Sequence, residues 1–242
     1  MTHPPGPDEF AEHSGDHTHA DVSGGALRAA VFGAMDGLVT TIALVAGVGG
    51  GGADRSVILL SGLAGVVAGA FSMALGEFAS VDTQNDAVRH EVSVERAEIL
   101  RHPNAEQAEL VARYEALGLT PATAAAMARE IHADPELAVR IHITDELGVD
   151  PTDSPSPWVA AISSFVCFAI GGLIPLASYL FGSSSLVLSL VIGGVGLVVA
   201  GALTSRFTTR PWWWSGLRQL FFGAIAAGAT FVVGSLIGVT VA

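Results

Sequence analysis

The sequence Phe71-Ser-Met-Ala-Leu-Gly-Glu-Phe78 lies inside a long apolar run and carries a thioether and a carboxylate four residues apart. The surrounding residues 57–81 are long and apolar enough to cross a hydrocarbon core of about 30 Å as one helix. A charge at that depth costs several kcal/mol and persists only with a partner or a purpose. Because residues i and i+4 share a helix face, Met73 and Glu77 can face one ion.

The composition predicts an integral membrane protein. Half of the 242 residues are hydrophobic, only 14% are charged, and the mean hydropathy is +0.54, which is more apolar than soluble domains of this size. All eleven basic residues are arginines outside any basic tract, so nucleic acid is not an expected partner. The single cysteine, Cys167, excludes an intrachain disulfide. No phosphate-binding loop, nucleophile elbow or zinc spacing is present, so enzyme chemistry is not predicted.

Four more apolar segments are expected to span the bilayer. They cover residues 26–48, with Asp36 at the middle, then 158–181, 186–205 and 215–242. Pro175 predicts a kink or a local opening in the third span. An odd number of spans places the two termini on opposite sides of the membrane.

Charged residues are concentrated between the second and third spans. Of 23 acids, 15 lie between Asp82 and Asp153. The second span has no stop signal before Pro103, so its helix is expected to continue out of the membrane to about Arg101. Three shorter helices follow at about 104–117, 120–133 and 135–147. The fold class is therefore all-α: a five-span transmembrane helical protein with an inserted acidic helical cytoplasmic domain.

We divide the chain into five parts: a disordered His-containing tail (1–20), spans one and two (21–81), a cytoplasmic helical metal-binding domain (82–149), a linker (150–157), and spans three to five (158–242). The side assignment follows from arginines. Arg28, the six arginines of the acidic domain and those of residues 206–218 fall on one side, against Arg55 on the other. The positive-inside rule makes the first side, with the N-terminus, cytoplasmic.

The acidic domain contains a candidate metal centre. Two Glu-x-x-Glu pairs each place two carboxylates on one helix face, and the break at Pro103 allows their helices to fold back together. An imidazole and a carboxylate four residues apart on the last helix complete the set. The candidate ligands are Glu95, Glu98, Glu106, Glu109, His142 and Glu146.

Simpler interpretations remain for each of these acids. Exposed helices often carry solvated glutamates, and Arg96 and Arg101 are available as ordinary surface partners. In the membrane, Asp36 or Glu77 could pair with Arg28 or remain protonated against a neighbouring helix. The tail histidines, at positions 3, 13, 17 and 19, could bind metal weakly, although low-complexity tails seldom fix ligand geometry.

The donor atoms favour a transition metal. A thioether is a poor ligand for Mg²⁺ or Ca²⁺ and a tolerable one for Fe²⁺, whereas carboxylate and imidazole suit Fe²⁺ and Mn²⁺ alike. We therefore expect Fe²⁺, or Mn²⁺, as a transported or bound ion, and no resident cofactor.

Beyond the tail, the chain resembles the vacuolar iron transporter family. The resemblance rests on Met35-Asp-Gly-Leu-Val-Thr-Thr41, Phe71-Ser-Met-Ala-Leu-Gly-Glu-Phe78, the inserted acidic helices and Asp145-Glu-Leu-Gly148. It implies a five-helix homodimer with an ion path between subunits near the first two spans. The implied activity is proton-coupled export of Fe²⁺ from the cytosol.

The resemblance also implies residue roles. Asp36, Met73 and Glu77 match the family's translocation residues. The matching metal-binding glutamates are Glu95, Glu98, Glu106, Glu109 and Glu146. Where plant members look to have two methionines, this chain has His142 and Ile143, so one soft ligand becomes an imidazole and the other is lost. The arginine-only, Ala- and Gly-rich composition looks bacterial, which implies a plasma membrane.

Three alternatives stay open. The first is a Mn²⁺ exporter on the same scaffold. The second is a membrane-anchored, ferritin-like iron store or ferroxidase, against which the intramembrane acids argue because an anchor has no use for them. The third is a metal sensor that gates another protein, for which the sequence offers no partner motif.

Overall fold

A computed structural model describes residues 25–207 and 209–241, so the expected tail lies outside the described residues. Within these ranges the chain is helical and contains no strand. The elements are α2 (Gly25–Gly50), α3 (Arg55–Arg101), α4 (Pro103–Ala116), α5 (Pro121–His132), α6 (Pro135–Leu147), α7 (Pro157–Leu180), α8 (Leu186–Thr204), η1 (Ser205–Phe207) and α9 (Trp212–Val241).

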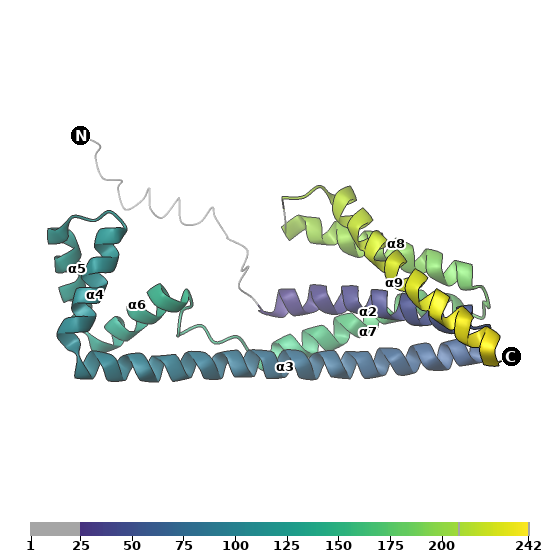
Figure 1. The fold of residues 1–242 in the computed structure, drawn as a ribbon, viewed down its shortest axis with the longest axis horizontal. Coiled ribbons are helices and arrows are strands. Elements are labelled where there is room, and N and C mark those ends of the chain that lie inside the picture. Colours follow the sequence, from purple (N-terminus) through teal and green to yellow (C-terminus); the bar gives the residue numbers. More distant parts are fainter. Residues whose placement is uncertain (1–24, 208, 242) are drawn as a thin grey trace, which may run out of the picture.

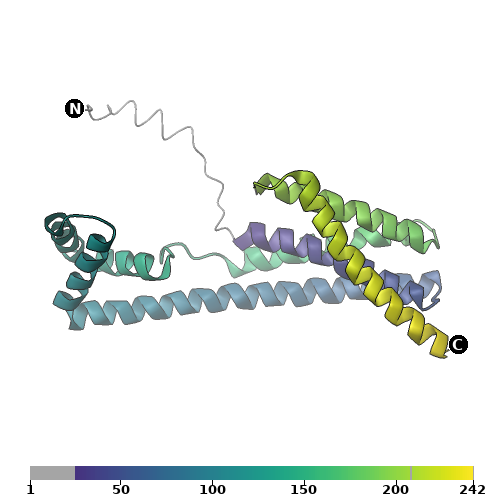
Figure 2. The same cartoon turned by 45° about the horizontal axis from the view of Figure 1, so that its top comes forward.

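Five of these helices are long and apolar enough to cross a membrane: α2, α3, α7, α8 and α9. This confirms the expected number of spans. Figures 1 and 2 show α2 and α7 lying along one half of α3, with α8 and α9 packed on their outer side. The C-terminal end of α9 lies at the end of this bundle opposite to α4, α5 and α6 (Figure 1).

Helix α3 extends far beyond the membrane-spanning part of the bundle. Its 47 residues correspond to about 70 Å at 1.5 Å per residue, more than twice the thickness of a hydrocarbon core. Asp54 caps its start by accepting hydrogen bonds from the backbone N–H groups of Ser56 and Val57. It ends at Arg101, two residues before Pro103, as expected. One rigid helix therefore joins the apolar bundle to the polar helices.

Close contact between α2 and α7 depends on glycine. A β-carbon at Gly37 would overlap the backbone oxygen of Phe168, and one at Gly171 would overlap the backbone oxygen of Ala34. Small residues let membrane helices approach until their backbones touch, which maximises van der Waals contact where lipid offers no hydrophobic driving force. A buried apolar cluster joins α2, α3 and α7 nearby: Val45, Ile58, Val66, Leu176 and Tyr179.

Two details differ from or refine the sequence expectations. Helix α7 is continuous through Pro175, whose carbonyl accepts a 2.7 Å hydrogen bond from the buried Ser189 hydroxyl of α8. Helix α9 begins at Trp212, three residues earlier than expected, because the Pro211 carbonyl accepts from the N–H groups of Trp214 and Ser215. The tryptophans thus form the first turn of the last span.

We expect Gly37→Ala to lower the stability of the bundle by about 1–3 kcal/mol, because the added methyl forces α2 away from α7. The thermal unfolding transition of the purified protein in detergent measures the effect. Gly228→Ala is the matched control, since a β-carbon at Gly228 meets no atom of the described residues within 4 Å and removes only backbone freedom. Equal transition temperatures for the two variants would contradict the packing role of Gly37.

Candidate metal sites

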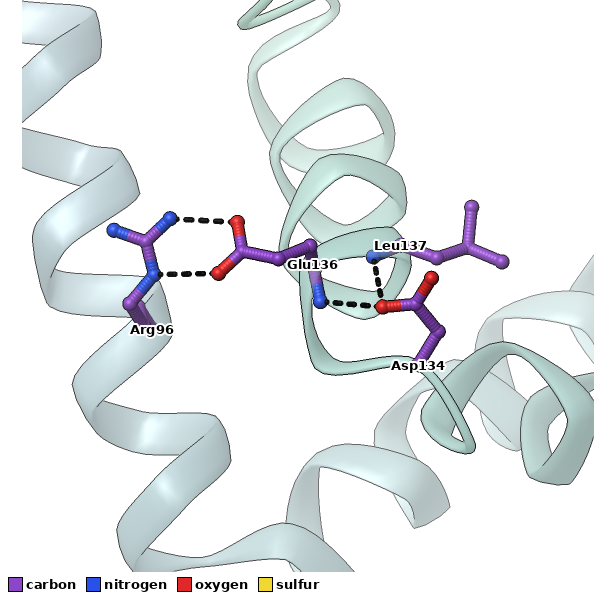
Figure 3. A network of polar contacts seen from close by, with 4 residues as sticks. All are labelled: Arg96, Asp134, Glu136 and Leu137. Atoms are coloured by element: carbon purple, nitrogen blue, oxygen red, sulfur yellow. Dashed lines mark hydrogen bonds and ion pairs between the residues drawn. The ribbon is translucent and has the colours of Figure 1, made fainter.

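Helix α6 is fixed against the distal part of α3 by apolar and ionic contacts. Ile99 of α3 packs in a buried cluster with Ala138, Val139 and Ile143 of α6. Arg96 holds Glu136 through two hydrogen bonds of 2.7 and 3.2 Å, the fork arrangement visible in Figure 3.

The start of α6 is capped at the same place. The Asp134 carboxylate accepts from the backbone N–H groups of Glu136 and Leu137 (Figure 3). The cap orients the first turn of α6, and the apolar cluster sets the rotation of the helix about its axis. His142, one to two turns further along, is thereby turned towards α3.

The reversal at Pro103 brings α4 to the same region. Pro103 occupies the first helical position of α4, and the N–H groups of Ala105 and Glu106 donate to the His102 carbonyl. Helix α4 contacts α3 and α5, and α5 contacts α6, so α4, α5 and α6 pack together at the distal part of α3. Figure 1 shows these short helices gathered at the end of α3 that lies away from the bundle.

Three carboxylates converge on one buried imidazole. The Nδ1 atom of His142 lies 3.2 Å from Glu95 Oε1, 3.8 Å from Glu106 Oε2 and 3.9 Å from Glu146 Oε1. His142 is 3% exposed and Glu95 11% exposed at the side chain, whereas Glu146 borders solvent. One donor atom each from Glu95, His142 and Glu146 fall within 4.8 Å of one another.

These separations suit a metal ion. Ligand atoms that each lie about 2.0–2.2 Å from an ion are about 3–3.5 Å apart, so small side-chain movements would bring this set to coordination distance. Glu95 is buried and Glu146 borders solvent, so the site has a solvent-facing side through which an ion can enter and leave. We refer to Glu95, Glu106, His142 and Glu146 as the carboxylate centre.

The electrostatics of the carboxylate centre favour a bound cation. Burial raises the pKa of Glu95 to about 7, and the charge of Glu146 adds to this shift. Burial also raises the pKa of Glu106 and that of Glu146, in both cases with a further contribution from the Glu109 carboxylate. Burial lowers the pKa of the His142 imidazole, which is therefore a neutral ligand at pH 7. A divalent ion relieves the repulsion that raises these carboxylate pKa values.

Two of the six candidate ligands lie at the edge of the centre. Glu98 pairs with Arg101 at 3.4 Å and approaches His102 Nε2 at 3.8 Å. Glu109 is exposed and acts on the centre through its charge. The surface-partner interpretation therefore holds for Glu98, while Arg96 pairs with Glu136 instead of the candidate ligands.

Sequence reasoning missed two groups beside the centre. His132 at the end of α5 packs its ring against His142, with centroids 5.3 Å apart. Asp145 pairs with Arg113 of α4 at 3.5 Å and so joins α6 to α4. The i, i+3 spacing of Asp145 from His142 was a usable signal, whereas nothing local marks His132.

The candidate residues in the spans have different partners. Glu77 is buried and forms a 2.8 Å ion pair with Arg28 of α2, the pairing considered above as the simpler interpretation. Asp36, half-buried on α2, accepts a 3.2 Å hydrogen bond from the hydroxyl of Thr40 on the same helix. Met73 is half-buried one turn before Glu77 on α3.

We expect metal affinity at the carboxylate centre to be full above about pH 7 and to fall with acidification. A raised carboxylate pKa means that Glu95 keeps its proton until the pH rises through about 7, and a bound ion must displace it. One displaced proton lowers the apparent affinity about tenfold per pH unit below that value. Titration calorimetry of the purified protein in buffers of different ionisation enthalpy measures both affinity and proton release.

Glu95→Gln is the matched variant for this titration. The amide keeps the size of the side chain but cannot ionise, so affinity should be lower and its pH dependence shallower. An affinity that stayed constant in the parent between about pH 5.5 and 8 would rule out proton competition at this centre.

Comparisons with known proteins identify the family of this sequence. A model of the VIT family matches residues 27–235. The chain is 31% identical over 234 residues to vacuolar iron transporter 1 of Eucalyptus grandis, covering 94% of this chain and 93% of that protein. It is 32% identical over 230 residues to vacuolar iron transporter 1 of Oryza sativa subsp. japonica, covering 93% and 91%.

A third relative gives a similar match. The vacuolar iron transporter of Acanthamoeba castellanii is 33% identical over 225 residues, covering 88% of this chain and 78% of that protein. These relatives are transporters and not enzymes, and their names indicate metal transport. With the apolar helices described above, they identify an integral membrane protein. The chain belongs to the VIT family.

Proposed function

We propose that this protein is a homodimeric exporter that moves Fe²⁺ out of the cytosol in exchange for protons. The observation that carries the proposal is the convergence of Glu95, Glu106 and Glu146 on His142, on helices attached directly to a membrane bundle that contains two further acids. An anchored iron store would need the first feature but not the second.

The proposed route begins at the carboxylate centre and ends in the spans. The arginine distribution supports a cytoplasmic position for α4, α5 and α6 and for the start of α2. The arginine-only, Ala- and Gly-rich composition supports a bacterial plasma membrane. An ion captured there would pass along α3 to Glu77 and Met73 and then to Asp36 of α2. The thioether on this route supports selectivity against Mg²⁺ and Ca²⁺.

Arg28 gives the route an internal counter-ion. Its guanidinium occupies the position beside Glu77 that an entering cation would take, and 62% of its side chain is exposed. An incoming metal ion would displace Arg28 towards solvent, and the pair would re-form once the ion moved on. The pair thus keeps the Glu77 carboxylate compensated when no metal is bound, as a charge at that depth requires.

Proton exchange has a chemical basis in the same acids. A carboxylate binds a divalent ion only when it is ionised and releases the ion when it is protonated. Alternate loading of Glu77 and Asp36 with metal and with protons would then couple the two flows. Manganese remains the second candidate ion, because the oxygen-rich carboxylate centre suits Mn²⁺ as well as Fe²⁺.

We expect Asp36→Ala to reduce Fe²⁺ flux by about tenfold or more, because it removes a ligand and a proton acceptor from the route. Flux into proteoliposomes with an imposed pH gradient measures this, with Mn²⁺, Co²⁺ and Zn²⁺ as competing ions. Asp82→Ala is the matched control, since Asp82 is an exposed acid beyond the apolar run. Parent-like flux in Asp36→Ala would refute the proposed path.

We expect Arg28→Ala to lower the Fe²⁺ concentration for half-maximal flux about threefold to fivefold. The pair joins a largely exposed arginine to a buried carboxylate, so we assign it about 1 kcal/mol, the upper value for exposed pairs, and the metal no longer has to displace it. Arg28→Lys retains the charge and should resemble the parent. A half-saturating concentration that was unchanged or higher in Arg28→Ala would show that Arg28 does not compete with the ion.

A further inference from the structure

Two histidine rings meet at the junction of α5 and α6. The centroids of His132 and His142 are 5.3 Å apart and their planes are inclined by 86°. The Nε2 atom of each ring is shielded from solvent and has no hydrogen-bond partner in residues 25–207 and 209–241. Buried ring nitrogens normally have partners, so two orphaned atoms on adjacent rings call for an explanation.

The protonated nitrogen of His132 can be assigned from its contact. Its Nδ1 lies 2.9 Å from the backbone oxygen of Ala128, and a carbonyl oxygen can only accept a hydrogen bond. Nδ1 therefore carries the proton, and Nε2 of the neutral ring has a free lone pair. Metal-binding histidines commonly have this arrangement, with one ring N–H donated to a backbone carbonyl and the other nitrogen bound to the ion.

His142 is assigned by the charges around it. Its Nδ1 faces oxygens of Glu95, Glu106 and Glu146 at 3.2–3.9 Å. A lone pair at Nδ1 would face carboxyl oxygens of three glutamates, whereas an N–H there is attracted to them. The proton is therefore favoured at Nδ1, and the buried Nε2 of His142 also has a free lone pair. Glu95 Oε1 lies 3.2 Å from Nδ1 without a hydrogen bond, and a small rotation would give the carboxylate–imidazole contact that orients metal-bound histidines.

We propose that His132 and His142 form a two-nitrogen metal subsite through their Nε2 atoms, next to the carboxylate centre. Two imidazoles that bind one ion at about 2.0–2.1 Å with a near-tetrahedral angle have ring centroids about 5 Å apart, close to the separation seen here. Water completes the coordination, since two protein ligands leave positions open.

The subsite deepens the proposed function by separating ions according to donor preference. Imidazole nitrogen suits Zn²⁺, Cu²⁺, Ni²⁺ and Fe²⁺, whereas Mn²⁺ is better served by the oxygens of the carboxylate centre. His142 links the two places: when its Nε2 binds an ion in the subsite, its Nδ1 keeps its proton and is a donor towards the carboxylates, not a ligand in the carboxylate centre. The subsite is tested by equilibrium metal binding, whereas the proposed function is tested by the flux of Asp36→Ala. Failure of one can therefore be distinguished from failure of the other.

The experiment uses the full chain in detergent at about pH 8, with the four tail histidines replaced by glutamine to remove competing nitrogens. One equivalent of Cu²⁺ is added, and pulsed electron paramagnetic resonance counts the imidazoles bound to it. We expect two imidazoles in this parent protein and fewer in His132→Ala and His132→Gln. The glutamine variant keeps a polar side chain of similar size for a chain that does not tolerate alanine. His102→Ala, which removes an exposed ring near Glu98, should leave two.

Competition titrations with Zn²⁺ and Mn²⁺ separate ligation from a general structural effect. Loss of one nitrogen ligand should weaken Zn²⁺ binding about tenfold or more while changing Mn²⁺ binding less. Fewer than two imidazoles in the parent, two in both His132 variants, or an equal loss of Zn²⁺ and Mn²⁺ affinity would each overturn the subsite.

Discussion

In a hydrocarbon core every peptide N–H and C=O must be satisfied within the protein, and this requirement shapes the whole molecule. It makes each span a helix, and in α3 the same hydrogen-bonding pattern continues without interruption past the apolar run to Arg101. The other parts are arranged on this helix. α7 packs along its apolar half, α6 is bound to its polar half through Ile99 and Arg96, and the linker returns beside it where Asn85 donates to the Pro155 carbonyl at 2.9 Å.

The two acidic places on α3 stabilise carboxylates by different means. Glu77 has a single arginine partner, which compensates its charge and ties α3 to the start of α2. Among the residues that the structure describes, no arginine pairs with Glu95, and the acids of the carboxylate centre respond to burial and to one another by holding protons more tightly. Under the proposed function, the first arrangement would exchange one cation for another, whereas the second would exchange protons for a cation. In both places a divalent cation would compete for the carboxylate, with Arg28 at Glu77 and with protons at the carboxylate centre.

Much of this structure could be predicted because its signals are local. Apolar length predicts the spans, and Pro103 predicts the end of α3. The two Glu-x-x-Glu pairs and the His142–Glu146 spacing predict candidate ligands, of which Glu95, His142 and Glu146 lie together. Glu98 and Glu109 share helices with Glu95 and Glu106 of the carboxylate centre, but the spacing rule does not say which carboxylate of a pair turns inward. The position of His132 depends on how α5 crosses α6, and the Arg28–Glu77 pair depends on the alignment of α2 with α3. How two helices lie against each other is set by tertiary packing, and this packing leaves no local pattern in the sequence.

The continuity of α3 fixes how Glu77 and Glu95 are related. They are separated by 18 residues, which at 3.6 residues per turn is five whole turns and about 27 Å. Both are therefore in phase on one side of the helix, and both are 8% exposed. A rotation of α3 about its axis turns the two carboxylates through the same angle, and a slide along the axis carries them the same distance. Neither acid can be re-aimed by a movement of the helix that leaves the other where it was.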